Sequence, residues 1–245
     1  MVALVGGGGK TSALHTLAQE LAAAGGRVIV ATTTAMYLRE MAVVGPVVTG
    51  AGGMTLAEEV RDALTEVPIV AIAPSVRAHG KVAGLPPETI DELWAAGLAD
   101  YALVEADGSR GRSLKAFAAH EPRVPDAATT IVQTAGLDAL GGPLSGDHVH
   151  RAEALASLLA RPLGSEVTAG VFADAVRLQV RRLRRLAAES RIVTLLNKAE
   201  GADGWASGML VGGELLRDAG PDVPDAVVVA SLRERRFARV SIPEK

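Results

Sequence analysis

Four consecutive glycines, Gly6, Gly7, Gly8 and Gly9, follow the short apolar run Val2–Val5, and they leave this chain few ways to fold. Directly after them come Lys10, Thr11 and Ser12. Glycine lacks a Cβ, so this backbone can adopt positive φ and wrap closely around an anion with its N–H groups pointing inward. Lys10 can reach the β and γ phosphates of a nucleotide, and the Thr11 hydroxyl can ligate Mg²⁺. The order of these residues therefore predicts a phosphate-binding loop for a nucleoside triphosphate.

The loop departs from the usual pattern G-x-x-x-x-G-K-[ST] at one position. Counting back from Gly9 places Leu4 where the first glycine belongs. Either the loop is shorter than usual, or Gly6 makes its turn. The competing interpretation is a glycine-rich helix N-terminus without nucleotide chemistry.

A strand-helix-strand pattern surrounds this loop. Leu14, Leu17 and Leu21 recur at helical spacing, Gly25 and Gly26 end the helix, and a strand over 27–31 follows. Such a βαβ unit crosses over right-handed and forms a parallel sheet. With 245 residues, 49% of them hydrophobic, the chain can bury one large core. We expect the α/β class, a three-layer P-loop NTPase with a mostly parallel central sheet, as a single domain over 1–245.

Two carboxylates, Glu105 and Asp107, end the apolar run that starts at Tyr101. If the strand continued past Glu105, both side chains would lie on the same side of it. Buried acids are unfavourable unless they are paired or bound to metal. We expect Mg²⁺ to be held by Thr11 with Asp107 or Glu105, and which acid meets the metal stays open. The alternative is two solvated turn residues.

A second strand, over 192–196, ends in Asn197, Lys198, Ala199 and Glu200. Guanine-specific P-loop proteins carry N-K-x-D at this place, where the carboxylate accepts two N–H groups of guanine. Here Glu200 replaces the aspartate and is one methylene longer. The pattern favours GTP over ATP as cofactor, against the alternative of a plain helix start after a strand.

Cations gather at two further places. Arg110, Arg112 and Lys115 follow the acids, where they suit an anionic substrate or form a solvated basic loop. The apolar stripe over 172–187 indicates an amphipathic helix whose outer face carries five arginines. That face is either solvated or a docking surface for an acidic partner or RNA.

Composition excludes several classes of function. The net charge of −3 provides no global basic field, so nucleic acid is not an expected partner. The chain has no cysteine, which excludes disulfides, thiolate metal sites and covalent sulfur chemistry within it. Its sequence shows no signal peptide and no apolar run of the ~20 residues that span a membrane, so we expect no membrane association and a cytoplasmic location.

Several blocks in order resemble the YqeC family, proposed as accessory proteins of selenium-dependent molybdenum hydroxylases. The blocks are Gly6–Ser12, Ala31–Thr34, Val104–Ser109, Leu114–Ala116, His120–Pro122, Gly136–Gly141, His150-Arg151 and Asn197-Lys198. The resemblance implies a P-loop NTPase that acts on a protein client, a molybdenum-cofactor hydroxylase or its maturation machinery. Glu200 departs from the guanine motif. Without cysteine the chain cannot carry selenium on its own thiols, so a role for selenium stays open.

These patterns lead to three functional hypotheses. The first is a Mg²⁺-dependent nucleoside triphosphatase in which Lys10, Glu105 and Asp107 are the catalytic residues. The second is a small-molecule kinase or ligase whose anionic acceptor binds Arg110, Arg112 and Lys115. The third is a nucleotide-sensing adaptor without turnover that docks through the basic face of 177–185.

Overall fold

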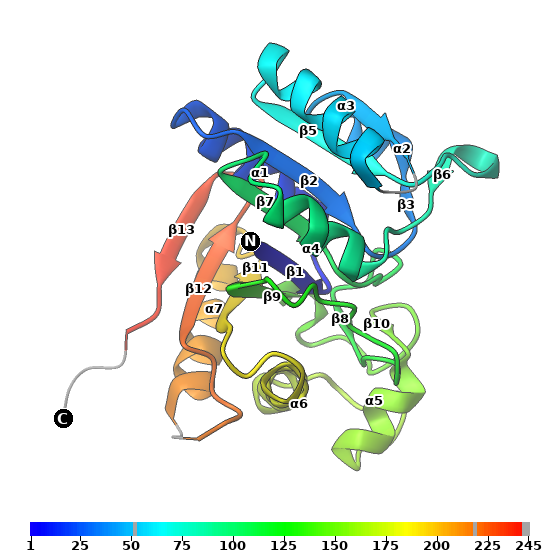
Figure 1. Cartoon of the computed structure of the whole chain (residues 1–245). Coiled ribbons are helices and arrows are strands. Elements are labelled where there is room, and N and C mark those ends of the chain that lie inside the picture. Colours follow the sequence, from blue (N-terminus) through cyan, green and yellow to red (C-terminus); the bar gives the residue numbers. More distant parts are fainter. Residues whose placement is uncertain (51–52, 218–219, 242–245) are drawn as a thin grey trace. The chain divides into compact units, whose positions relative to one another are not determined.

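The computed structural model describes residues 1–50, 53–217 and 220–241, and these divide into two compact units (Figure 1). Unit 1 comprises Met1–Leu4, Thr11–Gly108 and Arg123–Thr129. Unit 2 comprises Val5–Lys10, Ser109–Pro122 and the chain from Thr130 onward. The sequence-based expectation of a single domain over 1–245 stays a prediction.

Unit 1 is built on a parallel sheet. Its strands follow the order β1 (Val2–Gly6, whose last two residues belong to unit 2), β7 (Tyr101–Glu105), β2 (Val28–Thr32), β5 (Ile69–Ala73) and β4 (Val47–Thr49). Every residue of β2 and β5 is buried. Because successive side chains of a strand point to opposite faces, full burial means that both faces of the sheet are covered there. The register pairs Thr32 with Glu105, so β2 and β7 end at the same edge.

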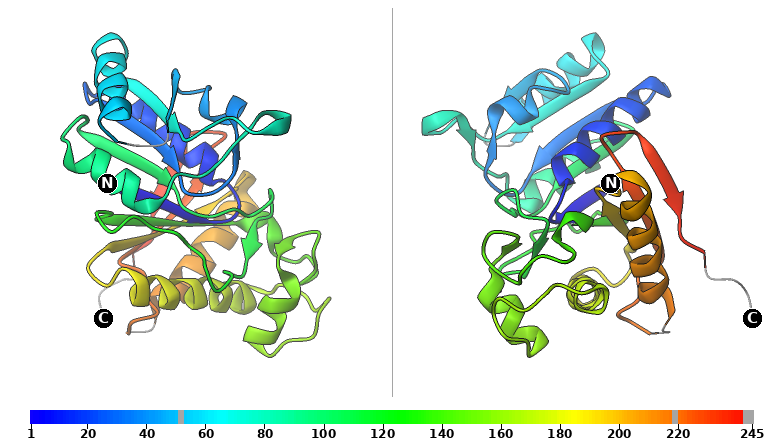
Figure 2. Two further views of the ribbon diagram at one scale, coloured as in Figure 1. Left: turned by 45° about the vertical axis from the view of Figure 1, so that its right-hand side comes forward. Right: turned by 180° about the vertical axis from the view of Figure 1, so that it is seen from behind.

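The helices of unit 1 connect and cover these strands. They are α1 (Lys10–Ala23), α2 (Leu38–Met41), α3 (Gly53–Glu66) and α4 (Pro87–Ala95), with a 3₁₀ turn η1 at Ala78–Gly80. Gly25, at φ 91°, follows the end of α1 as expected for a helix stop. Helix α3 lies against β4 and β5 (Figure 2). A short antiparallel pair, β3 (Met36–Tyr37) with β6 (Lys81–Val82), completes the unit.

Unit 2 has a four-stranded sheet that is parallel except at one end. The order is β9 (Thr130–Gly136), β11 (Arg191–Asn197), β12 (Ala226–Ser231) and β13 (Arg236–Arg239), with β13 antiparallel to β12. The register pairs Gly136 with Asn197, so β9 and β11 end side by side. A parallel pair, β8 (Leu114–Lys115) with β10 (Val149–His150), lies apart from this sheet.

The helices of unit 2 are α5 (Ala152–Leu159), α6 (Ala169–Leu186) and α7 (Gly201–Arg217), with a 3₁₀ turn η2 at Leu137–Ala139. Helices α6 and α7 pack against each other, α6 also against β9 and α7 against β12. The apolar stripe of α6 explains this placement, because Phe172, Val176, Val180 and Leu183 are all fully buried.

The predicted α/β class with a mostly parallel sheet is confirmed. No helix within the described residues is both long and apolar enough to cross a membrane.

Candidate functional site

The glycine loop is enclosed by backbone on several sides, all within unit 2. A Cβ on Gly6 would lie 2.2 Å from the carbonyl oxygen of Thr134, and one on Gly8 would lie 2.3 Å from the amide nitrogen of Gly136. Gly6 and Gly8 also have φ of 95° and 74°, which side chains other than glycine disfavour. The same four glycines that predict a phosphate loop are therefore the residues that fit this space.

Two of the loop amides are already used in holding the loop. The N–H of Gly7 donates to the carbonyl of Thr134 at 2.9 Å, and the N–H of Gly8 donates to the carbonyl of Arg112 at 3.0 Å. The expectation that all loop amides point inward is therefore wrong for Gly7 and Gly8. The donors that suit an anion are instead those of the first turn of α1, which have no intrahelical acceptor.

Lys10 folds back across the loop. Its side chain is buried, and Nζ donates to the carbonyl of Gly6 at 2.7 Å. This contact places the ammonium over the glycines that precede it. The structure thus brings Lys10 to the loop as predicted, whereas Ser12, also predicted to contact nucleotide, is exposed on α1.

Asn197 ties the end of β11 to the loop. Its amide Nδ2 donates to the carbonyl of Gly8 at 2.8 Å, and its Oδ1 accepts from the N–H of Leu232 at 3.1 Å. The side chain is 5% exposed, so both hydrogen bonds are shielded from water. The asparagine predicted for the base site therefore also fixes the backbone of the phosphate loop.

Lys198 and Glu200 follow this strand end but have different surroundings. Nζ of Lys198 donates to Oγ of Ser113 at 2.8 Å and to Oδ2 of Asp138 at 2.7 Å. The Glu200 side chain is about half exposed, with a carboxylate oxygen 3.9 Å from Nη1 of Arg233. Lys198 is held beside the loop segment, whereas Glu200 stays accessible at the start of α7.

In unit 1, Thr11 and Glu105 lie together. Oγ1 of Thr11 donates to Oε2 of Glu105 at 2.8 Å. The backbone carbonyl of Glu105 accepts from Thr33 N at 3.0 Å and from Thr32 Oγ1 at 3.1 Å. A hydroxyl beside a carboxylate provides the hard oxygen ligands that Mg²⁺ takes in nucleotide sites.

Asp107 is buried just beyond the end of β7, with only 1% of its surface exposed. The strand ends at Glu105, so the simple alternation expected for Glu105 and Asp107 does not extend to the second acid. Within the described residues no group of three or more His, Asp or Glu side chains is arranged to hold a metal ion. A Mg²⁺ ion here would need ligands beyond these carboxylates, as it commonly takes from phosphates and water.

Lys115 lies in a buried ion-pair network, so the alternative of a solvated basic loop does not hold for Lys115. Its side chain is fully buried, and Nζ lies 2.8 Å from Oε2 of Glu121. The same carboxylate accepts from Nη1 and Nη2 of Arg151 at 2.6 and 3.1 Å. Burial raises the pKa of Glu121, but the hydrogen bonds from Arg151 and Lys115 outweigh it and bring the pKa to about 2.

The arginines of α6 are mostly engaged within unit 2. Arg177 pairs with Asp174, Arg181 with Asp222 and Arg184 with Asp225. Arg182 donates to the carbonyl of Ala119 at 2.8 Å. The basic face is thus partly neutralised by acids of its own unit.

Sequence reasoning missed the residues that support the loop through their backbone. Thr134 and Arg112 supply the carbonyls that hold Gly7 and Gly8, and Ser113 and Asp138 hold Lys198. Carbonyl acceptors carry no signal in side-chain identity. The block at 136–141 contained Asp138, but only the fold shows what it contacts.

Comparison with known proteins gives one family and one curated relative. A family model described as YqeC protein matches residues 2–153. An uncharacterized protein YqeC of Escherichia coli (strain K12) is 40% identical over 152 residues, which are 62% of this chain and 57% of that protein. The match thus spans less than two thirds of the length of that relative.

Solved structures of low sequence identity include two FtsY proteins. Chloroplast FtsY from Physcomitrella patens is 13% identical with a TM-score of 0.46, over 98% of this chain and 61% of that one. The signal recognition particle receptor FtsY from Elizabethkingia anophelis is 14% identical with a TM-score of 0.37, over 97% of this chain and 60% of that one.

Proposed function

Because the chain belongs to the YqeC family, as its motifs indicated, we propose that it binds and hydrolyses a nucleoside triphosphate with Mg²⁺. This proposal depends on two contacts of neighbouring residues. Lys10 donates to the backbone carbonyl of Gly6 in the glycine loop, and Thr11, the next residue in the sequence, donates to the carboxylate of Glu105. Glycines without room for side chains, an ammonium over them and a hydroxyl next in sequence form the arrangement that binds phosphates.

The proposed roles follow from the chemistry of phosphoryl transfer. Charge develops on the oxygens of the transferred group, and groups held in place before the reaction stabilise it. Lys10 supplies positive charge to the β and γ phosphates. Mg²⁺, when bound, neutralises charge on the same oxygens. Thr11 with Asp107 or Glu105 would hold the ion, and the other acid would position the attacking water.

We propose GTP rather than ATP as the preferred nucleotide. Asn197 is anchored to the loop through Gly8, which supports a base site at the end of β11. Glu200 is accessible there and carries the carboxylate that guanine would need. The ion pair of Glu200 with Arg233 is long, at 3.9 Å, and exposed, so it is weak. A guanine base can therefore take the place of Arg233 at the Glu200 carboxylate.

We further propose that the client is a molybdenum-cofactor hydroxylase or its maturation machinery, acted on by a nucleotide-dependent accessory protein. The support is the family resemblance. The kinase alternative loses one of its three cations, because Lys115 is buried with Glu121. The adaptor alternative loses much of its free charge to the acids paired with α6.

The test is nucleotide binding by calorimetry and thermal shift with GTP, ATP and CTP, each with Mg²⁺. Free ligand at a hundredfold over Kd adds about 2.7 kcal/mol to stability, which raises the melting temperature measurably. Lys10→Ala is expected to abolish binding. Lys81→Ala removes the same charge from an exposed position in unit 1 and is the matched control.

Retention of micromolar affinity by Lys10→Ala contradicts the proposed site. A melting shift with ATP alone contradicts the role of Glu200 and leaves the phosphate loop in place. Turnover is followed as release of inorganic phosphate, and binding without release over hours supports the adaptor in place of the hydrolase.

A further inference from the structure

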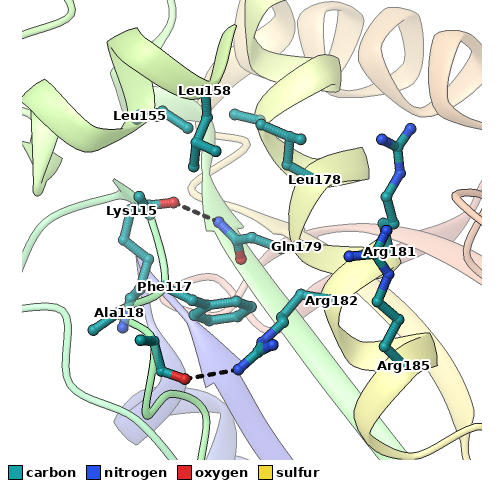
Figure 3. A pocket seen from close by; sticks show the side chains of 13 residues that line it. Lys115, Phe117, Ala118, Leu155, Leu158, Leu178, Gln179, Arg181, Arg182 and Arg185 are labelled. Carbon is teal, nitrogen blue, oxygen red and sulfur yellow. Dashed lines mark hydrogen bonds between the residues drawn. The ribbon is translucent and has the colours of Figure 1, made fainter.

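A cavity lies wholly within unit 2, and none of its lining residues belongs to the glycine loop. It has a volume of about 350 Å³ and is walled by α5, α6 and the segment 115–119 (Figure 3). That volume falls at the lower end of the range of small-molecule pockets. The cavity takes no part in the nucleotide site proposed above.

One side of this cavity is apolar. Phe117 comes from the segment 115–119, Leu155 and Leu158 from α5, and Leu178 from α6. Leu158 is 60% exposed, so a ligand in the cavity can cover its side chain. These side chains would bury the hydrocarbon or aromatic body of a ligand and be stabilised by losing contact with water.

The other side is cationic. Arg182 and Arg185 lie three residues apart on α6, about one helical turn, and Figure 3 shows Arg182 extending alongside the ring of Phe117. Arg182 uses Nη2 for the carbonyl of Ala119 at 2.8 Å. Among the described residues, Arg185 forms no hydrogen bond and no salt bridge within 4 Å, although its charge helps to lower the pKa of Asp222. Guanidinium groups can grip a carboxylate or phosphate through two parallel hydrogen bonds.

The base of the cavity is rigid and polar. Lys115 is fixed there by Glu121 and stacks its ammonium 5.2 Å from the centre of the Phe117 ring. Gln179 is buried, and its Nε2 donates to the carbonyl of Lys115 at 2.8 Å. Both polar side chains are thus already paired, so the cavity keeps its shape before a ligand arrives.

We propose that this cavity binds a small, water-soluble organic anion with an apolar body and one carboxylate or phosphate. The body packs against Phe117, Leu158 and Leu178, and the anionic group binds Arg182 and Arg185. The volume fits one such molecule, and the two arginines on a single side fit one terminal charge. The proposal is independent of the glycine loop, so it is tested without nucleotide.

The experiment is titration of the ¹⁵N-labelled full chain with 4-phenylbutyrate, followed by amide chemical shifts. Saturable shifts are expected in the segment 115–119 and in α5 and α6. 4-Phenylbutanol and inorganic phosphate separate the contribution of the apolar body from that of the charge, and each is expected to bind at least about tenfold more weakly.

Variants then assign the two sides. Arg182→Gln with Arg185→Gln is expected to raise Kd about tenfold or more. Leu158→Asn, at a position that is 60% exposed, is expected to raise Kd severalfold. Arg217→Gln on α7 removes an exposed arginine outside the cavity and is expected to leave Kd unchanged.

The proposal is overturned if 4-phenylbutyrate causes no saturable shift up to millimolar concentrations, or if the alcohol binds as well as the acid. It is also overturned if only phosphatidylglycerol vesicles or an acidic leucine-containing peptide shift these amides. The proposal is likewise overturned if the affinity for 4-phenylbutyrate is unchanged in both the arginine variant and the Leu158 variant.

Discussion

Replacing Glu121 by glutamine isolates the buried ion pair of unit 2. The glutamine side chain keeps the size of glutamate and can still accept from Arg151 and from the N–H of Ala118. It cannot supply the negative charge that Lys115 faces at 2.8 Å. The fully buried ammonium of Lys115 would then lack its counter-charge.

Two independent estimates give the loss of stability expected for Glu121→Gln. Removing one partner of a buried pair typically destabilises a protein by about 3–5 kcal/mol, because the remaining charge is left in a poor solvent. Independently, the fall of the Glu121 pKa from 4.5 to about 2 corresponds to about 3 kcal/mol, or about 2 kcal/mol after discounting for solvent screening. We therefore expect Glu121→Gln to lower the free energy of unfolding by about 2–4 kcal/mol at pH 7.

The assay is urea unfolding at 25 °C as a function of pH. Because the pKa of Glu121 is lower in the folded protein, its stabilisation is complete above about pH 4.5 and is lost as the pH falls towards 2. The difference between the wild type and Glu121→Gln is expected to shrink over that range, since a protonated glutamate resembles glutamine.

Glu189→Gln is the control, because Glu189 is exposed and should change stability by less than about 0.5 kcal/mol. Adding Lys115→Met to Glu121→Gln is expected to recover about 1–2 kcal/mol by removing the orphaned charge. A Glu121→Gln variant as stable as the wild type at pH 7, or a difference that stays constant from pH 6 to pH 3, would refute this reasoning.

Two further substitutions test the loop and its neighbours. Gly8 and Gly141 share a φ of 74°, but only Gly8 lacks room for a Cβ. Thermal unfolding is therefore expected to show that Gly8→Ala destabilises the protein by at least about 2 kcal/mol more than Gly141→Ala does. Equal losses of stability would contradict the close approach of Gly8 to Gly136. Thr11→Val keeps the shape of the side chain but removes the hydroxyl that donates to Glu105. Calorimetry should then show that the increase in nucleotide affinity caused by Mg²⁺ falls about tenfold or more. An unchanged increase would exclude Thr11 as a Mg²⁺ ligand.

Regular elements bounded by glycine or proline were predictable from the sequence. The strand and the helix that flank the glycine loop were found where expected. In these segments local propensity, hydrophobic pattern and turn residues all favour the same structure. The mostly parallel sheet followed from the order of these elements.

Elements that depend on a neighbour were not predictable. Strand β13 contains two arginines and no apolar run, and it forms because the edge of β12 offers free backbone groups. Likewise, nothing in the pattern around Lys115 showed that Glu121 and Arg151 would enclose it, since the burial of a charge depends on partners brought together only by folding.

The candidate site divides in the same way. Side-chain identities predicted Lys10 over the loop and Thr11 near a strand-end acid, and both contacts are present. The backbone donors of Gly7 and Gly8 were assigned to phosphate but serve the loop itself. The partners of those amides are carbonyls, which every residue has, so the sequence could not single them out.

The segment from Arg112 to Ala119 forms backbone hydrogen bonds at both of its ends. At one end the carbonyls of Arg112 and Ser113 receive the amides of Gly8 and Gly136, and at the other end the carbonyl of Ala119 receives Arg182. This segment therefore contacts both the glycine loop and the helix that lines the cavity. If a ligand bound in the cavity beside Phe117 raises the affinity of the glycine loop for a polyphosphate, the coupling is reciprocal. The polyphosphate must then raise the affinity of the cavity for that ligand by the same factor.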